Sequence, residues 1–254
     1  MNKRVVNNLI AWIFEYVKST KAKGVVVGMS GGKDSLIVAK LCAMALGSEN
    51  VFGIIMPNGK MIDIDDAIKS CNLLGIEYTT INIGNCYDTM IDNVKKAIPN
   101  NNVLDVTIIN TAPRLRMTTL YAVAGSLNYL VANTSNLSET MVGYTTKWGD
   151  NVGDFSPIAN FTKTEVCELG ILLGLPDELV NKPPRDGLSG KSDEDKLGFS
   201  YGELDNLIRK NIKGKNYDKI VLAHKKSLHK RNPIAKFKKI GKNYLKNTKN
   251  NIKW

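Results

Sequence analysis

Short apolar runs alternate with amphipathic segments along the chain. The apolar runs predict β-strands at residues 24–29, 51–56, 76–83 and 129–132. Apolar positions with helical spacing predict helices at residues 1–18, 34–46, 63–74, 86–98, 113–127, 138–144 and 162–174. Strands that alternate with helices are typical of an α/β fold, here an open parallel sheet with helices on both faces.

Three segments are less regular. Pro113 is expected in the first turn of its helix, where its missing N–H costs nothing, and residues 101–109 fit no single element. Residues 182–198 are polar and rich in Gly and Pro, which predicts a loop and indicates a lid that orders over bound phosphates. A helix is expected to begin near Tyr201, and a basic helical tail is expected to follow it.

Length and composition bound the architecture. The 254 residues are 43% hydrophobic and 23% charged, which suits one globular domain over 1–254 with a basic helical C-terminal segment at 205–254. This length leaves no room for a glutaminase domain. No apolar run reaches the ~20 residues of a membrane span, and the first helix is amphipathic, unlike a signal peptide. The four cysteines form no C-x-x-C pair, so we expect buried free thiols and a cytoplasmic protein.

The net charge of +11 is concentrated at the end of the chain. Residues 205–254 hold 16 Lys and Arg against 2 Asp and Glu, whereas residues 1–204 hold 19 against 22. A tail of this kind suits nucleic acid, an acidic membrane surface or a phosphorylated substrate. A solvated basic surface is the favoured interpretation, because no nucleic-acid motif or interleaved aromatic residues accompany the charge.

The strongest local signal is the sequence Ser30-Gly-Gly-Lys-Asp-Ser35, between a predicted strand and a predicted helix. Gly31 and Gly32 allow a sharp turn close to a ligand, and the N–H groups at the helix start attract an anion. The hydroxyls of Ser30 and Ser35 add donors. Asp34 would repel a phosphate, and a Mg²⁺ ion that bridges the two resolves this conflict. The alternative is a Gly-rich turn whose Asp34 and Ser35 only cap a helix.

This loop resembles the pyrophosphatase loop of the N-type ATP pyrophosphatases, which cleave ATP between the α- and β-phosphates and adenylate a substrate oxygen. Further motifs narrow the resemblance. Their order and spacing are similar to those of the NAD synthetase family at 133–139, 143–150, 154–158, 161–165, Asn110 to Met117, Asp193 to Tyr201 and His229 to Pro233. The fold of that family is Rossmann-like, of the adenine nucleotide alpha hydrolase type.

The resemblance implies a ligase that amidates deamido-NAD (nicotinic acid adenine dinucleotide) with ammonia, through an adenylated carboxylate, to give NAD, AMP and diphosphate. It implies ATP as co-substrate, Mg²⁺ as cofactor and a homodimer. Without a glutaminase domain, free ammonia is the expected nitrogen donor. Neither a membrane nor nucleic acid is an expected partner.

The resemblance also assigns roles to residues. The implied metal ligands are Asp34 and Glu139. The implied catalytic residues are Asp34, Lys163 and Asp150, with Asp150 or Asp154 as an acceptor for the proton of ammonia. The implied ATP contacts are Ser30, Gly31, Gly32, Ser35, Met56, Thr134, Lys163, Arg185 and Ser192. The implied substrate contacts are Arg114, Lys147, Asp150, Asp154, His229 and Lys230.

The sequence departs from the family pattern at two places. Met61 stands where many relatives have a Gln on the adenosine side. In the loop at 182–188, nothing matches a Thr that contacts phosphate in relatives, and Arg185, Ser189 or Ser192 is the expected substitute.

Simpler interpretations stay open for several residues. Glu139 also suits the acidic first turn of a helix. Lys147 and Asp150 also suit a salt bridge within a turn, and His229 also suits a plain surface position. Arg116 matches a motif position without an assigned role, and it cannot share a helix face with a residue two positions away.

Two other functions compete with the ligase. A tRNA-modifying ATP pyrophosphatase would explain the loop and the basic tail, but it leaves the block Thr146-Lys-Trp-Gly-Asp150 unexplained. A nucleotide sensor without catalysis predicts loss of the metal-binding acids, and both are present at Asp34 and Glu139.

Overall fold

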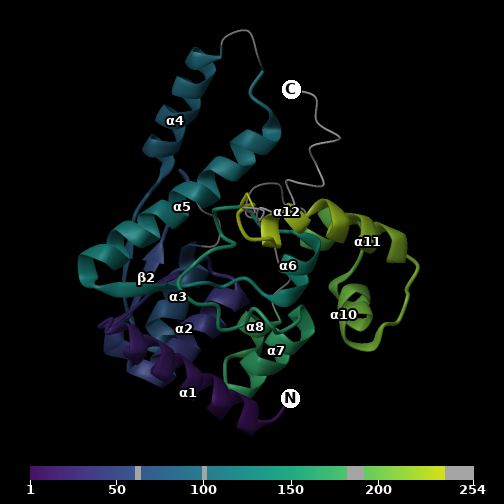
Figure 1. The fold of residues 1–254 in the computed structure, drawn as a ribbon. Coiled ribbons are helices and arrows are strands. Elements are labelled where there is room, and N and C mark those ends of the chain that lie inside the picture. Colours follow the sequence, from purple (N-terminus) through teal and green to yellow (C-terminus); the bar gives the residue numbers. More distant parts are fainter. Residues whose placement is uncertain (61–63, 99–101, 182–191, 238–254) are drawn as a thin grey trace, which may run out of the picture.

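The structure, a computed structural model, describes residues 1–60, 64–98, 102–181 and 192–237. In this part of the chain a parallel sheet has four strands in the order β3-β2-β1-β4 (Figure 1). They are β1 (Gly24–Gly28), β2 (Val51–Ile55), β3 (Glu77–Thr80) and β4 (Tyr129–Ala132). Each predicted strand is present. The order reverses beside β1, since β2 follows it on one side and β4 lies on the other.

Helices cover both faces of the sheet. Val25 and Val27 of β1 face a large apolar cluster, and Val26 between them faces another, as the alternation of side chains along a strand requires. The first cluster is covered by α1 (Lys3–Thr20), α2 (Lys33–Leu46), α3 (Ile64–Leu74) and α7 (Lys163–Leu172). The second is covered by α4 (Gly84–Ala97) and α5 (Asp105–Leu127). The predicted fold class is confirmed.

A smaller apolar cluster lies beside the sheet and joins the C-terminal helices to the centre of the chain. Leu204 and Tyr201 pack there with Val142 and Ile220. The elements that meet at this cluster are α6 (Leu137–Val142), α10 (Tyr201–Lys210) and α11 (Tyr217–Lys226). The remaining short helices are η1 (Ser48–Asn50), α8 (Asp177–Val180), α9 (Asp193–Leu197) and α12 (Leu228–Arg231).

The prediction for Pro113 is wrong. Helix α5 begins eight residues earlier, at Asp105, so Pro113 lies inside it. Inside a helix, a proline loses its own hydrogen bond and its ring crowds the carbonyl of residue i−4. Helix α5 nevertheless continues through Pro113, with Ala112 and Met117 buried against the sheet. Residues 105–109, which fitted no element, form its first turns.

The predicted loop at 182–198 is wrong at its C-terminal end, because residues 193–197 form α9. Ser192 and Asp195 make a capping box there, a start signal that the polar composition obscured. The basic tail is helical over α11 and α12, and residues 238–254 lie outside the described residues. Cys42 and Cys71 are buried free thiols, as expected, whereas Cys86 is exposed. Within the described ranges, no helix is long and apolar enough to cross a membrane.

Candidate active site

The glycine-rich loop lies at the carboxyl end of β1, where the strand order reverses. This is where open α/β sheets bind ligands. Gly31 has a φ of 77°, in the left-handed region that glycine adopts without strain. Gly32 is the N-cap of α2 and supplies no side-chain cap, so the first N–H groups of the helix face the loop. Ser30 and Ser35 close the loop, their hydroxyl oxygens lying 3.2 Å apart.

A second loop, from β4 to α6, lies beside the first one, because β4 pairs in parallel with β1. Its Asn136 is the N-cap of α6 and forms a capping box with Glu139, which places Glu139 in the first turn of the helix. The side-chain amide of Asn136 also donates to Oδ1 of Asp34 at 3.3 Å. The simple interpretation of Glu139 as a helix acid is therefore correct, and its carboxylate also accepts from Lys163.

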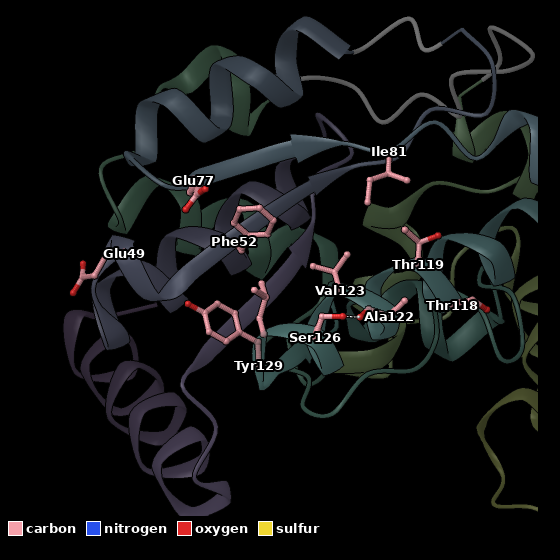
Figure 2. Close-up of a pocket in the computed structure, with 11 residues that line it drawn as sticks. Glu49, Phe52, Glu77, Ile81, Thr118, Thr119, Ala122, Val123, Ser126 and Tyr129 are labelled. Carbon is pink, nitrogen blue, oxygen red and sulfur yellow. Dashed lines mark hydrogen bonds between the residues drawn. The ribbon is translucent and has the colours of Figure 1, made fainter.

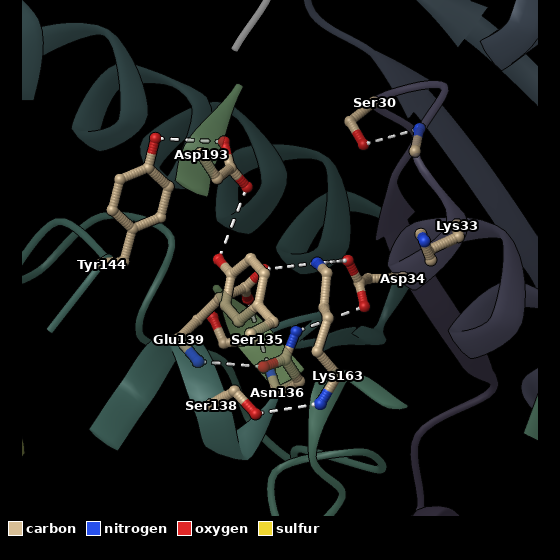
Figure 3. A network of polar contacts seen from close by, with 12 residues as sticks. Ser30, Lys33, Asp34, Ser135, Asn136, Ser138, Glu139, Tyr144, Lys163 and Asp193 are labelled. Carbon is tan, nitrogen blue, oxygen red and sulfur yellow. Dashed lines mark hydrogen bonds and ion pairs between the residues drawn. The ribbon is translucent and has the colours of Figure 1, made fainter. Parts of the chain in front are cut away.

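Lys163 lies between the two carboxylates and is the centre of a charged cluster (Figure 3). Its Nζ is 2.7 Å from Oδ2 of Asp34 and 2.7 Å from Oε1 of Glu139. All three side chains are largely buried, with exposed fractions of 7% for Lys163, 19% for Asp34 and 15% for Glu139. Lys163 is the first residue of α7, so three separate elements bring the cluster together.

Burial and charge act in opposite directions in this cluster. Burial raises the pKa of Glu139 above its ordinary value, and although Lys163 lowers it, repulsion from Asp34 raises it further. Burial lowers the pKa of Lys163, but Glu139 and Asp34 outweigh this and hold it well above its usual range. The lysine is therefore charged at every physiological pH, and the cluster carries a net negative charge when both acids are ionised.

The two carboxylates fit a divalent cation by their chemistry. Oxygen ligands from two acids, with the remaining positions taken by phosphate and water, are what Mg²⁺ prefers. No cluster of three or more potential ligand side chains occurs among the described residues, and Asp34 and Glu139 supply two. In the structure, the ammonium group of Lys163 lies where the carboxylates of Asp34 and Glu139 meet.

The loop that contains Asp150 packs against the β4 loop. Oδ1 of Asp150 accepts from the N–H of Thr146 at 2.6 Å, and its carbonyl accepts from Asn133 and Ser135. Desolvation raises the pKa of Asp150, and the N–H of Thr146 and the charge of Lys230 lower it in part. Arg116 is half-buried, and desolvation lowers its pKa while the charge of Asp150 raises it in part.

Arg114 and Arg116 point in different directions from α5, as their spacing requires. Nε of Arg114 donates to the carbonyl of Lys147 at 3.2 Å, and Nε of Arg116 donates to the carbonyl of Met56, just past the end of β2, at 2.9 Å. The ammonium of Lys147 lies 5.3 Å from the ring centre of Trp148, so the alternative of a salt bridge with Asp150 is not observed.

Asp154 lies at the edge of the sheet instead. Its Oδ2 accepts from the N–H of Val131 at 2.7 Å, and its Oδ1 accepts from the hydroxyl of Tyr121. Its carbonyl accepts from the hydroxyl of Tyr16. These contacts secure the edge of β4, and they leave this carboxylate poorly placed to accept a proton from a substrate.

The basic residues near the C-terminus hold the end of α6. Nζ of Lys230 donates to the carbonyls of Gly143 and Thr145 at 2.7 and 2.6 Å, and Arg231 donates to the carbonyls of Thr140 and Met141. Cations at a helix C-terminus offset the partial negative charge of its last carbonyls. His229 is exposed beside them. Thr134 is half-buried in the β4 loop, and Met56 is buried.

Several sequence expectations lie outside the described residues, namely those for Met61, Arg185 and Ser189. Ser192 is described, and its hydroxyl caps α9. Lys33, inside the glycine-rich loop, is buried and donates to Sγ of Cys167 in α7 at 3.5 Å.

The sequence analysis matched Asp193 and Tyr201 to a motif without a role, and it did not predict that they lie close to Lys163. Asp193 is buried and accepts from the hydroxyls of Tyr144 and Tyr201, at 3.1 and 3.5 Å. The ammonium of Lys163 lies 5.3 Å from the ring centre of Tyr201. These residues come from distant parts of the chain, so no local spacing indicates that they meet.

A pocket lies away from these residues, on the α5 face of the sheet (Figure 2). Phe52 and Tyr129 line it from the strands, and Thr119, Val123 and Ser126 line it from α5. None of the predicted site residues lines it, so it is not part of the candidate site.

The fold and the site define a class of nucleotide-binding α/β protein. In this class a glycine-rich anion-binding loop follows a central strand, here β1, and charged side chains meet beside the loop. Comparison with known proteins identifies the family. The family model described as NAD synthase matches residues 5–248. The chain belongs to the NAD synthase family. The predictions of this family, of its fold and of a ligase that uses ATP are confirmed.

Individual relatives agree with this assignment. The chain is 43% identical to the NH(3)-dependent NAD(+) synthetase of Thermococcus sibiricus, over 81% of this chain and 79% of that one. It is 39% identical to the enzyme of that name from Finegoldia magna, over 95% and 98%. Among solved structures, NMN synthetase from Francisella tularensis matches with a TM-score of 0.86 at 32% identity, covering 94% of this chain and 98% of that one. The NH3-dependent NAD synthetase of Campylobacter jejuni has a TM-score of 0.76 at 30% identity, over 94% and 100%.

Proposed function

We propose that the protein amidates deamido-NAD with free ammonia and ATP, giving NAD, AMP and diphosphate. The observation that carries this proposal is the convergence of Asp34, Glu139 and Lys163 beside an anion loop. Two relatives that match 81% and 95% of this chain are named NH(3)-dependent NAD(+) synthetase. The family model covers residues 5–248, and we propose free ammonia as the nitrogen donor because both of these relatives are named NH(3)-dependent.

Adenylation is the first step that we propose. A carboxylate oxygen of the substrate attacks the α-phosphorus of ATP, the bond to the bridging oxygen breaks, and diphosphate leaves with the electron pair. The N–H groups of Gly31 and Gly32, with the hydroxyls of Ser30 and Ser35, would hold the diphosphate. Lys163 would offset the charge that builds up on the phosphates. A Mg²⁺ ion on Asp34 and Glu139 would supply charge neutralisation at the phosphates.

Ammonia completes the reaction in this proposal. NH₃ attacks the carbonyl carbon of the adenylated carboxylate, the nitrogen loses a proton, and AMP leaves with the carboxylate oxygen. We assign the proton to Asp150, an exposed carboxyl whose pKa lies above its ordinary value, which makes it a better base. We propose Arg114, Lys147 and Lys230 as contacts of the dinucleotide, together with the exposed His229.

A second substrate is favoured by one specific observation. The Francisella tularensis structure, titled NMN synthetase, has a higher TM-score than the Campylobacter jejuni NAD synthetase over the same 94% of this chain. A mononucleotide carries the same reactive nicotinate carboxylate, so the site chemistry described above serves either substrate. The two candidate substrates differ in one part of the molecule: deamido-NAD carries an additional adenylate group, which the site would also have to bind.

The experiment that tests the proposal uses the full chain with ATP, Mg²⁺ and ammonium. Deamido-NAD and nicotinic acid mononucleotide are supplied separately, and amide product is measured for each. We expect NAD to form with a higher kcat/KM than the mononucleotide amide, and we expect little product when glutamine replaces ammonium. A preference for the mononucleotide selects the second candidate, and efficient use of glutamine contradicts the proposed donor.

The cellular setting is part of the proposal. ATP and ammonia are substrates of the cytosol, and the free thiols of Cys42 and Cys71 suit a reducing compartment. We therefore propose a cytoplasmic enzyme. Fractionation of the native host, followed by immunodetection, should place the protein with cytosolic markers, and recovery with membranes would contradict this.

A further inference from the structure

Asp205 is a buried carboxylate that the proposed mechanism does not use. It belongs to α10 and is 6% exposed. Its Oδ1 accepts from the hydroxyl of Ser138, and its Oδ2 accepts from the N–H and the hydroxyl of Thr164, at 2.8 and 2.7 Å. Burial of a charged group is costly unless hydrogen bonds compensate for the lost water. Three donors are therefore committed to this one residue.

The donors are chain neighbours of the residues that carry the charge of the site. Ser138 precedes Glu139 in the first turn of α6, and Thr164 follows Lys163 in the first turn of α7. The N–H of Lys163 also donates to the Ser138 hydroxyl, at 2.9 Å. Asp205 therefore joins the starts of two helices, and the side chains of Glu139 and Lys163 meet 2.7 Å apart from this shared base.

Other contacts attach α10 to the molecule without Asp205. Leu204 is fully buried in the apolar cluster with Val142 of α6. Arg209, at the other end of α10, pairs with Glu165 of α7 at 2.6 Å. The helix is therefore held by packing and by an ion pair. What Asp205 adds is a directional restraint on the first turns of α6 and α7, because hydrogen bonds weaken steeply when they are misaligned.

We propose that Asp205 is a positioning residue that orients Lys163 and Glu139 toward Asp34 and the phosphates of ATP. It does not touch the substrate. The proposal rests on the proposed function, because the reaction defines which placement is productive. When a reacting group is displaced by ~1 Å, the rate of the reaction can fall by about 100-fold. Asp205→Ala, which releases both first turns, should therefore lower kcat by about 10- to 100-fold.

The test compares Asp205→Ala and Asp205→Asn with Glu203→Gln in the full chain. Glu203 belongs to the capping box of the same helix and accepts from Asn216, so its substitution weakens α10 without touching α6 or α7. Rates are measured below the thermal midpoint of each variant.

We expect a loss of kcat in both Asp205 variants, with a smaller loss for Asp205→Asn. We also expect an unchanged KM for deamido-NAD and a wild-type kcat for Glu203→Gln. A folded Asp205→Ala with wild-type kcat, or an equal loss in Glu203→Gln, overturns the proposal.

Ser138→Ala keeps the proposal testable if Asp205→Ala does not fold. Because Ser138 and Asp205 act as a unit, the double variant with Asp205→Asn should lose no more than the larger single loss. Additive losses contradict the proposal. If the wild-type chain forms no amide, the proposed function fails instead. In that case, the affinity for Mg·ATP is measured by calorimetry as the readout of positioning. We expect Asp205→Asn to bind Mg·ATP about tenfold more weakly than Glu203→Gln, equivalent to ~1.4 kcal/mol. Equal affinities overturn the proposal.

Discussion

At the scale of single residues, Lys163 has two roles in the candidate site. It neutralises two carboxylates that would otherwise repel each other, and it is the cation that we expect to meet the phosphates of ATP. Its high pKa keeps it charged, so it acts as an electrostatic group and not as an acid or a base. A neutral side chain of similar length would remove both effects.

Lys163→Met should therefore lower kcat strongly. Removal of one preorganised donor from an active site costs about 100- to 1,000-fold in kcat, and we expect a loss in that range. Steady-state kinetics of the variant, with its fold verified by circular dichroism, make the measurement. Lys95→Met, on the exposed face of α4, is the matched control and should keep wild-type activity. A Lys163→Met enzyme within threefold of wild type would disprove the electrostatic role.

Residues of the site differed in how far the sequence could predict them. Asp34 lies in a contiguous motif whose purpose is predicted from local chemistry, and in the structure its Oδ2 accepts from Lys163. Glu139 was open to a simpler interpretation, and it serves as a helix acid while facing Asp34. Asp205 could not be found, because its partners Ser138 and Thr164 lie 67 and 41 residues away in the chain. Asp193 belonged to a matched motif, but its contact with Tyr144, 49 residues away, could not be predicted.

At the scale of elements, α7 supplies Lys163 and is attached to α10 by an exposed ion pair. Arg209 donates to both carboxylate oxygens of Glu165, at 2.8 and 2.6 Å. Burial alone would raise the pKa of Glu165. The hydrogen bonds from Arg209 and from the N–H of Thr162 outweigh burial and lower this pKa below its ordinary value of 4.5.

Glu165→Gln should destabilise the fold at neutral pH but not in acid. The lowered pKa means that the ionised carboxylate stabilises the folded state above pH ~4.5, and that this contribution disappears as the pH falls through the folded-state pKa. An exposed bidentate pair contributes about 0.5–1 kcal/mol. Urea unfolding of both proteins at several pH values measures the difference. A difference that persists below the folded-state pKa would contradict this assignment.

The elements themselves followed the pattern of apolar residues closely, because strand and helix periods are local properties. The error at Pro113 has a physical cause. The rule that proline begins helices reflects its missing N–H, and packing of Ala112 and Met117 on the sheet outweighs that single lost bond. The short helix α9 was missed because five residues carry too little periodicity.

At the scale of the whole molecule, α5 is the surface on which we propose that two copies of the chain meet. Val106 and Ile109 near its start are 57% and 62% exposed, and Tyr121 and Leu127 further along are 39% and 40% exposed. Large exposed apolar side chains on one helix are costly in water unless a partner covers them. We expect a mass of twice 28.0 kDa by light scattering after size exclusion.

The control for assembly is a pair of charge substitutions. Ile109→Glu should shift the protein toward the monomer, whereas Leu222→Glu, an equally drastic change at an exposed position of α11, should leave the dimer intact. A wild-type monomer at micromolar concentration, or dissociation by both variants, would contradict the proposed interface.

The basic C-terminal charge is explained only in part. Lys230 and Arg231 are engaged with carbonyls at the end of α6, so they stabilise the fold around the site. With Arg209, which pairs with Glu165, these make three of the 16 cations that residues 205–254 contain. The interpretation of the remaining charge as a solvated basic surface stays a prediction.

The central claim is that the carboxylate of the substrate is adenylated, and isotope transfer tests it most directly. Deamido-NAD labelled with ¹⁸O in both carboxylate oxygens is converted with ATP, Mg²⁺ and ammonium, and the products are separated and weighed by mass spectrometry. Attack of the carboxylate on the α-phosphorus predicts one ¹⁸O in each AMP and none in diphosphate. Unlabelled AMP, or ¹⁸O in a phosphate released from the γ-position, would contradict the account.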